Sequence, residues 1–288
     1  MKKQFLDCVV TMLMTISATV AAKAEEPRTW WVNAKNYNEA YATADDYIAA
    51  GFDGTTPEKG FGTIQIGIDK SSAGDTINVK EGVYDKGSTV MWSNNTRVVV
   101  DKNVTIVGVD GWEKTFIVGH QAIGEDGSDA YGNGPNAVRC VAATSVMRMS
   151  NFTICNGATY YSSSVNTSST YCGGGIAANG SSRVFTDCMI SNNVCARYGS
   201  GAYYGVFRRC RFFKNTAKSA GAATYNAVAF ACVFSGNNNI NNNYYSLENG
   251  GSGKYLNCTV VGNADPTFGA SMGYNCLFTM NANESKCN

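Results

Sequence analysis

Apolar and polar positions in the second half of the chain follow a repeated pattern. Each repeat has a cysteine, a large apolar residue two positions later, and an asparagine three positions after that, as in Cys188, Ile190 and Asn193. Residues two apart in a strand point to the same side, so the cysteine and the apolar residue share one face. The repeats start 22, 22, 26 and 18 residues apart, at Cys188, Cys210, Cys232, Cys258 and Cys276. This spacing predicts a solenoid in which each coil covers the core of its neighbour.

The length and composition of the repeat select a β-solenoid. A unit of 22 residues is too short for a tetratricopeptide or ankyrin repeat, and a leucine framework is absent. Short strands broken by glycine and asparagine predict an all-β, single-stranded parallel β-helix with coils stacked about 4.8 Å apart. We expect two buried columns, one of Cys188, Cys210 and Cys232 and one of Ile190, Phe212 and Phe234.

The polar residues of the repeat predict where the coil turns. Asparagine tolerates left-handed backbone angles, so we place the repeated asparagine at a bend, where stacked amides can bond to one another. Arg208 lies two residues before Cys210 and would point inward on a straight strand. An unpaired buried arginine is costly, so the chain must bend between Phe207 and Cys210 and leave Arg208, Arg209 and Arg211 outside.

The first half of the chain contains the same kind of short strand. The spacing of Phe61, Ile64 and Ile68 predicts one short amphipathic helix. A glycine-rich segment, 124–135, is predicted to be a loop. Residues 151–157 form an earlier copy of the repeat with Phe152 in the cysteine position, and a Ser/Thr/Asn-rich loop follows at about 160–170. Strands are predicted at 30–32, 76–79, 97–100, 103–107 and 115–118.

The chain opens with the pattern of a secretory leader. Two lysines, an apolar stretch and Ala22-Lys23-Ala24 predict a signal peptide over 1–24, a lead-in and cap segment over 25–74, and β-helix coils over 75–288. We therefore expect an exported protein, at the cell surface, outside the cell or in the periplasm, with no membrane span in the mature chain. The sequence stops at Asn288 directly after a repeat, so we expect an uncapped last coil and an end-to-end contact there.

Cysteine usage favours buried thiols over metal binding. Of 11 cysteines, five occupy the core position of the repeat, a role that free cysteine fills well. Neither CxxC pairs nor clustered histidines occur, which excludes a zinc site of the usual kind. Cys155 and Cys172 flank the Ser/Thr-rich loop and are the best candidates for a disulfide.

Particular segments of the sequence resemble two known families. Residues 60–65 (GFGTIQ), 73–79 (AGDTINV) and 82–84 (GVY) look like the N-terminal coil of right-handed parallel β-helix proteins of the pectin-lyase-like superfamily. Gly174-Gly175-Ile176 and the repeated Phe…Asn spacing resemble the repeats of polymorphic outer membrane proteins. The first resemblance implies a right-handed coil with a capping helix, and a superfamily that includes polysaccharide lyases and glycoside hydrolases.

Residues for catalysis are sparse. A glycosidase needs two carboxyl groups facing one sugar, and the coils from Cys188 onward carry only Glu248, Asp265 and Glu284. Glu125, Asp126 and Asp129, with Asn133, are candidates for calcium, the one cofactor considered. His120 is the single histidine, with no partner identified in the sequence. We therefore assign no catalytic and no metal-binding residue.

A binding role rests on the basic half of the chain. Residues 25–138 carry 17 acidic and 9 basic side chains, whereas residues 139–288 carry 4 and 11. One repeat gathers arginines next to tyrosines, a pairing suited to sugars and anions, and the simpler alternative is a merely solvated surface. The net charge of +1 argues against nucleic acid. The candidate ligand-binding residues are Tyr203, Tyr204, Arg208, Arg209, Arg211 and Lys214.

The sequence thus predicts an exported β-helix protein with a structural, adhesive or glycan-binding role and no catalysis. Its expected partner is a polysaccharide or a cell-surface glycan. The alternative is a polysaccharide lyase or glycoside hydrolase of the pectin-lyase-like fold that acts on an acidic polysaccharide.

Overall fold

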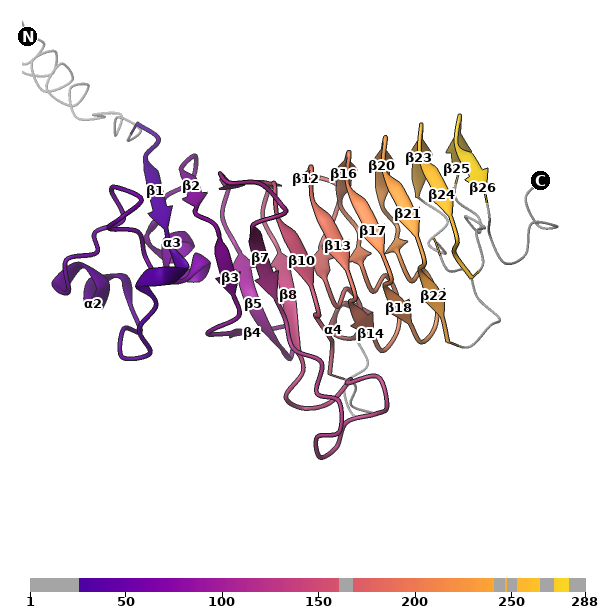
Figure 1. Cartoon of the computed structure of the whole chain (residues 1–288), viewed down its shortest axis with the longest axis horizontal. Helices are drawn as coiled ribbons and strands as arrows, with labels where there is room; N and C mark the ends of the chain where they lie inside the picture. The colour runs from indigo at the N-terminus through magenta and orange to yellow at the C-terminus, as the bar shows by residue number, and fades with distance from the viewer. Residues whose placement is uncertain (1–25, 161–167, 241–246, 248–252, 265–271, 280–288) are drawn as a thin grey trace, which may run out of the picture.

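The computed structural model describes residues 26–160, 168–240, 247, 253–264 and 272–279. Over these residues the chain winds into an elongated solenoid whose axis runs from the N-terminal cap toward the last strands (Figure 1). The predicted leader over 1–24 and the expected end-to-end contact at Asn288 lie outside the described residues. No helix in the described part of the chain has the length and apolar character that a membrane crossing requires.

Parallel strands form the walls of the solenoid, in four sheets of the described residues. Sheet A, in spatial order, consists of β1 (Thr29–Val32), β2 (Thr76–Val79), β6 (Val104–Gly108), β9 (Met147–Ser150), β12 (Arg183–Thr186), β16 (Val206–Arg208), β20 (Val228–Phe230), β23 (Lys254–Leu256) and β25 (Met272–Tyr274). Sheet B consists of β3 (Gly82–Tyr84), β7 (Thr115–Val118), β10 (Thr153–Cys155), β13 (Met189–Ser191), β17 (Arg211–Phe213), β21 (Val233–Ser235), β24 (Thr259–Val261) and β26 (Leu277–Thr279).

Two smaller sheets complete the cross-section. Sheet C consists of β4 (Thr89–Met91), β5 (Asn94–Val100), β8 (Val138–Ala143), β11 (Ile176–Ala178), β15 (Ala202–Tyr203) and β19 (Thr224–Tyr225). Sheet D consists of β14 (Val194–Cys195), β18 (Thr216–Ala217) and β22 (Asn238–Asn239). Within the described strands, only the β4–β5 hairpin is antiparallel. The topology is that of a right-handed parallel β-helix, as the sequence predicts.

Short helices close the N-terminal end. The predicted amphipathic helix is α3 (Ile64–Lys70), which begins at its N-cap Thr63 and buries Ile64 and Ile68. It lies against β1, β2 and β5 (Figure 1). A 3-10 turn, η1 (Ala34–Asn36), and a second helix, α2 (Ala44–Ala49), were not predicted. A further short helix, α4 (Ser168–Tyr171), precedes β11.

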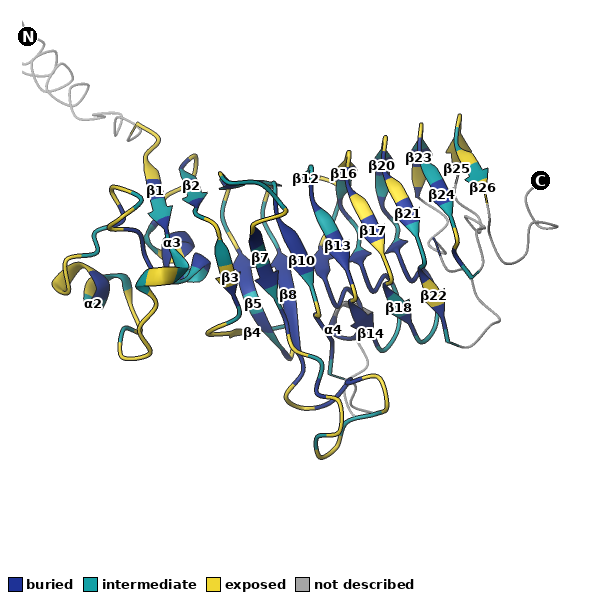
Figure 2. Ribbon diagram, in the orientation of Figure 1, coloured by how far each residue is buried: buried dark blue, intermediate teal, exposed yellow. Residues whose placement is uncertain are grey.

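The two predicted core columns are confirmed. Ile190 pairs with Phe212, and Phe212 pairs with Phe234, with the two phenyl rings stacked 5.0 Å apart. In the neighbouring column, the cysteines from Cys188 to Cys258 are at most 1% exposed. The backbone N–H of Cys210 donates to the Cys232 Sγ over 3.4 Å. Figure 2 shows this buried interior along the coils, with exposed residues on the outward side of β17. Burial of these columns is the main stabilising contribution to each coil.

The asparagine ladder is confirmed, but the bend is one residue earlier than predicted. Asn193, Asn215, Asn237 and Asn263 are at most 1% exposed, and the Nδ2 of each of the first three donates to the Oδ1 of the next, over 2.9 to 3.0 Å. The left-handed residue lies just before each of them, as Asn192 (φ 53°), Lys214 (φ 52°), Gly236 (φ 63°) and Gly262 (φ 62°). The asparagine itself therefore points inward, where its amide satisfies buried backbone groups.

The earlier copy of the repeat departs from this ladder for a steric reason. Gly157 occupies the asparagine position, and its backbone N–H donates to the Asn193 Oδ1 over 2.8 Å. A Cβ placed on Gly157 would lie 2.1 Å from the Gly174 carbonyl oxygen and 2.7 Å from the Cys140 Sγ. The two backbones are too close for any side chain here, so the ladder begins with Asn193.

The predicted bend before Cys210 is confirmed, whereas the suggested disulfide is wrong for this structure. Arg209 has a left-handed φ of 52°, and Arg208, Arg209 and Arg211 are exposed. Cys155 and Cys172 are both free thiols, the first half-buried and the second buried. Cys155 lies in sheet B, whereas Cys172 lies on the approach to sheet C, so the two belong to different faces of the coil.

A buried arginine ties the segment before β11 to sheet C. Arg139 is 0% exposed, and its guanidinium donates to the carbonyls of Gly173, Cys172 and Thr170 over 2.9, 3.0 and 3.2 Å. Burial lowers the pKa of Arg139 to about 10, so the side chain stays charged at neutral pH. The carbonyl oxygens take the place of water around this charge.

Arg139→Met is therefore expected to destabilise the fold. The substitution keeps much of the apolar stem but leaves buried carbonyls without donors, so we expect the free energy of unfolding to fall by about 2 kcal/mol. Denaturant titration monitored by circular dichroism measures this difference. Arg148→Met, on the exposed face of β9, is the matched control and should change stability by less than about 0.5 kcal/mol. Equal stabilities of the two variants would contradict this role for Arg139.

Candidate functional site

The candidate site lies at the edge where the strands of sheet B end. Asp85 and Lys86 follow β3, the segment 119–121 follows β7, and Asn156 follows β10. Because these strands are parallel and in register, the residues that follow them lie along one edge of the solenoid. The loop 119–137 projects beside this edge (Figure 1).

Three hollows adjoin one another along this edge, and we call them together the edge groove. Asp85 and Arg97 line both the first and the second hollow, and Gln121 lines both the second and the third. The second hollow has a volume of about 560 Å³ and the third about 380 Å³. The groove thus extends from the N-terminal cap to β22.

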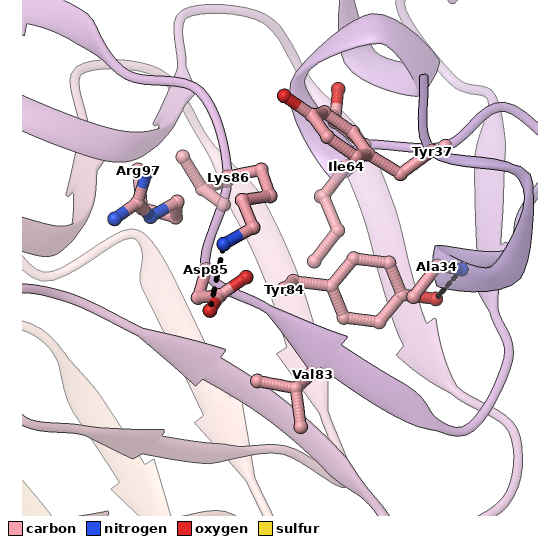
Figure 3. Close-up of a pocket in the computed structure, with 11 residues that line it drawn as sticks. Ala34, Tyr37, Ile64, Val83, Tyr84, Asp85, Lys86 and Arg97 are labelled. Carbon is pink, nitrogen blue, oxygen red and sulfur yellow. Dashed lines mark hydrogen bonds and ion pairs between the residues drawn. The ribbon is translucent and has the colours of Figure 1, made fainter. Parts of the chain in front are cut away.

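The first hollow, about 130 Å³ in volume, brings charged and aromatic residues together beside η1. The Lys86 Nζ lies 3.4 Å from the Asp85 Oδ2, and Arg97 lies close to this pair (Figure 3). Tyr84 forms part of the wall, and its hydroxyl accepts from the Ala34 N–H over 3.2 Å and donates to the Lys80 carbonyl over 2.9 Å. Lys86 is 57% exposed and can reach a ligand.

Arg97 connects the first and second hollows. Its Nε donates to the Val118 carbonyl over 2.9 Å, and an Nη donates to the Gly87 carbonyl. Burial lowers the pKa of the Arg97 guanidinium, which is half-buried. Its two hydrogen bonds in the described residues are to neutral carbonyls, so the positive charge has no directly bound carboxylate. An anionic group in the groove would complete its coordination.

The structure gives His120 the partner that the sequence did not reveal. The His120 Nε2 lies 2.7 Å from the Glu125 Oε1, and the Asn136 Nδ2 donates to the other carboxylate oxygen over 2.8 Å. Hydrogen bonds from Asn136 and His120 lower the pKa of the Glu125 carboxyl. This contact orients the imidazole of His120, which lines the second hollow. This pair resembles the orienting half of an acid–base unit.

The calcium candidates are not brought together. The Asp129 carboxylate accepts from the backbone N–H groups of Tyr131 and Asn133, over 2.8 and 3.0 Å, and pairs with Lys218. Burial raises the pKa of Asp129, but hydrogen bonds from Lys218 and those two amides outweigh it, and the pKa lies below its usual value. Glu125 is engaged by His120, and Asp126 is exposed. Among the described residues no three His, Cys, Asp or Glu side chains form a metal-binding group.

The residues predicted to bind a ligand are spread over three faces. Tyr203 lies in sheet C, Arg208 at the end of β16 in sheet A, and Arg211 in β17 of sheet B. Tyr204 and Arg209 occupy the corners between these strands, and Lys214 follows β17. A strand and its successor in one coil face different directions, so nearness in the sequence did not place these side chains on one surface.

Several of these side chains already have partners. Arg209 forms two bonds to the Asp187 carboxylate, over 2.8 and 2.7 Å. The guanidinium of Arg208 lies 4.9 Å from the ring centre of Phe230. The guanidinium of Arg211 lies 4.9 Å from the ring centre of Trp112. Tyr203 stacks on Tyr225 at 5.6 Å. Their role in ligand binding stays a prediction.

Sequence reasoning missed Asp85, Lys86, Arg97 and Gln121. The available signal was positional, because Asp85 and Lys86 directly follow the predicted first coil that ends at Tyr84. Gln121 follows the predicted strand 115–118 in the same way, and its Nε2 donates to the Asn192 carbonyl over 2.5 Å. Aligning the ends of successive strands would have placed these residues on one edge.

Comparisons with known proteins give matches in structure alone. No protein-family model and no protein of curated function matches the sequence. A rhamnogalacturonan lyase structure matches with a TM-score of 0.48 at 10% identity, and the match covers 88% of this chain and 62% of the lyase chain. The present chain thus spans less than two thirds of that protein's length.

Pectin methylesterase structures match as well. The rice weevil enzyme gives a TM-score of 0.44 at 9% identity, covering 76% of this chain and 87% of its own. The enzyme PemA from Erwinia chrysanthemi gives a TM-score of 0.37 at 11% identity, and the match covers 87% of this chain and 89% of the PemA chain. The assignment as a parallel β-helix rests on the sheet topology described above, and the resemblance to polymorphic outer membrane proteins stays a prediction.

Proposed function

We propose that the protein binds an extended polysaccharide that carries carboxylate groups, with the sugar chain lying in the edge groove. The observation that supports this most directly is the line of three adjoining hollows, joined by Asp85 and Arg97 and then by Gln121. A groove parallel to the solenoid axis suits a linear polymer better than a compact ligand. Hydrogen-bonding side chains line it, as polyhydroxylated ligands require.

Charge in the first two hollows supports a preference for acidic sugars. Arg97 lines both hollows and the exposed Lys86 lines the first, so two cations lie beside the single carboxylate of Asp85. A carboxylate bound there would receive charge-assisted hydrogen bonds. Export, with an extracellular, surface or periplasmic location, is part of this proposal and rests on the leader pattern of residues 1–24.

Lys86→Ala is expected to weaken binding of an acidic oligosaccharide. Loss of one exposed charge-assisted contact should raise Kd by about tenfold, equivalent to about 1.4 kcal/mol. Isothermal titration calorimetry with a uronic oligosaccharide measures this, at two salt concentrations. The matched control is Lys254→Ala, an exposed lysine of β23 on sheet A, which should leave Kd unchanged. Equal affinities of the Lys86→Ala and Lys254→Ala variants would contradict the proposed site.

A second candidate function is cleavage of the same polymer, and the His120–Glu125 pair favours it. An imidazole oriented by a carboxylate can act as a general base, here toward a sugar in the second hollow. Asp85 is the one carboxylate among the residues that line the three hollows, so elimination next to a uronic carboxylate fits this arrangement better than hydrolysis by a carboxylate pair.

His120→Gln separates the two functions. If the protein cleaves the polymer, this variant should lose more than about a hundredfold in rate while Kd changes by less than about threefold. Release of unsaturated uronate, followed by ultraviolet absorbance, measures the rate. Binding by the unmodified protein without any release of product would eliminate the cleavage hypothesis and leave the binding function intact.

A further inference from the structure

The third hollow differs in chemistry from the other two. It is a slot between the loop residues Gln121, Ile123, Ala130 and Tyr131 and the outward side of sheet D. Its floor consists of Val194, Thr216 and Asn238, which follow one another in register up sheet D, with Asn239 and Ile240 at the far end. None of the residues that line it is charged.

The loop side of the slot presents exposed apolar groups, and its floor carries polar side chains without partners. Tyr131 is 38% exposed and Ile123 is 61% exposed, so an apolar and aromatic surface faces the space. On the floor, the Thr216 hydroxyl and the Asn238 amide form no side-chain hydrogen bond within the described part of the chain, and Asn238 is exposed. An aromatic face opposite free hydroxyl and amide groups is complementary to a sugar ring, which has apolar C–H faces and polar edges.

Contacts at both ends hold the slot open. Asp129 accepts from the Tyr131 N–H over 2.8 Å and pairs with Lys218, which follows β18. The same strand supplies Thr216, so this ion pair fixes Tyr131 relative to the floor of the slot. At the other end, Gln121 donates to the Asn192 carbonyl over 2.5 Å. A site whose walls are fixed before binding loses less conformational entropy when a ligand enters.

We infer that this slot binds an uncharged pyranose residue, stacked on Tyr131 and hydrogen-bonded to Thr216 and Asn238. The inference rests on the proposed function in one respect, that the sugar belongs to the same chain that lies in the charged hollows. Gln121 borders both the second hollow and the slot, so a single polymer can occupy both. The ligand is then a polysaccharide in which neutral and acidic residues both occur.

The chemistry of the slot also disfavours an acidic sugar. A uronate placed there would lose water around its carboxylate without gaining a cation, because the nearby Lys218 is already paired with Asp129. The charged hollows select a carboxylate, whereas the slot rejects one. Because the two ends of the groove differ in this way, they favour one orientation of the bound polymer over the reverse.

Titration calorimetry on the full chain tests the inference with two probes, a neutral oligosaccharide series and a purely uronic oligosaccharide. We expect Tyr131→Ala to raise Kd for the neutral probe by about tenfold, with Kd for the uronic probe unchanged. Tyr131→Phe keeps the stacking ring and should bind like the unmodified protein. Lys86→Ala should raise Kd for the uronic probe and leave Kd for the neutral probe unchanged. Circular dichroism verifies that each variant folds.

The outcomes separate this inference from the proposed function. One result would overturn the inference and preserve the proposed function. In it, Lys86→Ala weakens binding of the uronic probe, but the unmodified protein binds the neutral probe no more tightly than the Tyr131→Ala variant does. Neutral binding that depends on Tyr131, without any effect of Lys86→Ala on uronic binding, would support the slot and contradict the charged site. Failure of both probes to bind would overturn both.

Discussion

Replacing Asn215 by alanine is expected to lower the free energy of unfolding by about 4 kcal/mol. The Asn215 Oδ1 accepts from both the backbone N–H and the Nδ2 of Asn193, and its Nδ2 donates to the Ile190 carbonyl and the Asn237 Oδ1. All of these groups are buried, so the alanine variant leaves several of them unsatisfied, at about 1–3 kcal/mol each. Since whole domains are stable by only about 5–15 kcal/mol, this is a large fraction of the total.

Chemical denaturation of the Asn215→Ala variant measures the effect. The matched control is Asn238→Ala, in the next coil, whose side chain is exposed and forms no bond in the ladder. The control should change stability by less than about 0.5 kcal/mol. If the two variants were equally stable, the asparagine ladder would not be a main stabilising element of the coils.

Alkaline solution is expected to unfold the protein through its buried thiols. Burial raises the pKa of Cys210 and, to about 11, that of Cys195. Hydrogen bonding to the neighbouring thiol raises the pKa of Cys232 and of Cys258. In the unfolded chain the same thiols have a pKa of about 8.5.

The direction of the effect follows from proton binding. Below about pH 8.5 the thiols are protonated in both states, and their full contribution to stability is present. Above that pH the unfolded state loses protons while the folded state keeps them, so the free energy of unfolding falls as pH rises. The expected slope is about 1.4 kcal/mol per pH unit for each such thiol, until the folded-state pKa is reached.

Urea titrations at increasing pH measure this slope, and Cys210→Ala provides its control. Removal of this thiol should reduce the slope by the contribution of one group, although the variant is less stable at every pH because its core is less well filled. A stability that does not change between neutral and alkaline pH would show that the buried thiols do not govern this transition.

The core of the fold could be predicted from the sequence because its rule is local. The cysteine and the apolar residue two positions later share a face in any strand, so the repeat alone predicted the columns of Cys210 and Phe212. The bend at Arg209 followed from the cost of burying Arg208. Both predictions use neighbouring residues only, and both hold in the structure.

The site could not be predicted in the same way because it depends on how coils of unequal length stack. Lys86 and Arg97 belong to one coil and His120 to the next, and they line one edge only once the ends of β3 and β7 are aligned. The residues predicted around Arg208 lie on different sheets for the converse reason, since a few residues are enough to pass from sheet A to sheet B. The Glu125 partner of His120 required the path of the loop 119–137, which no periodic pattern encodes.

A crystal structure of the protein with a bound acidic oligosaccharide tests the central claim most directly. The account predicts sugar density along the edge groove, with a carboxylate near Lys86 and Arg97 and the chain continuing past Gln121. Density on the outward face of sheet A or sheet C, with the edge groove empty, would contradict it.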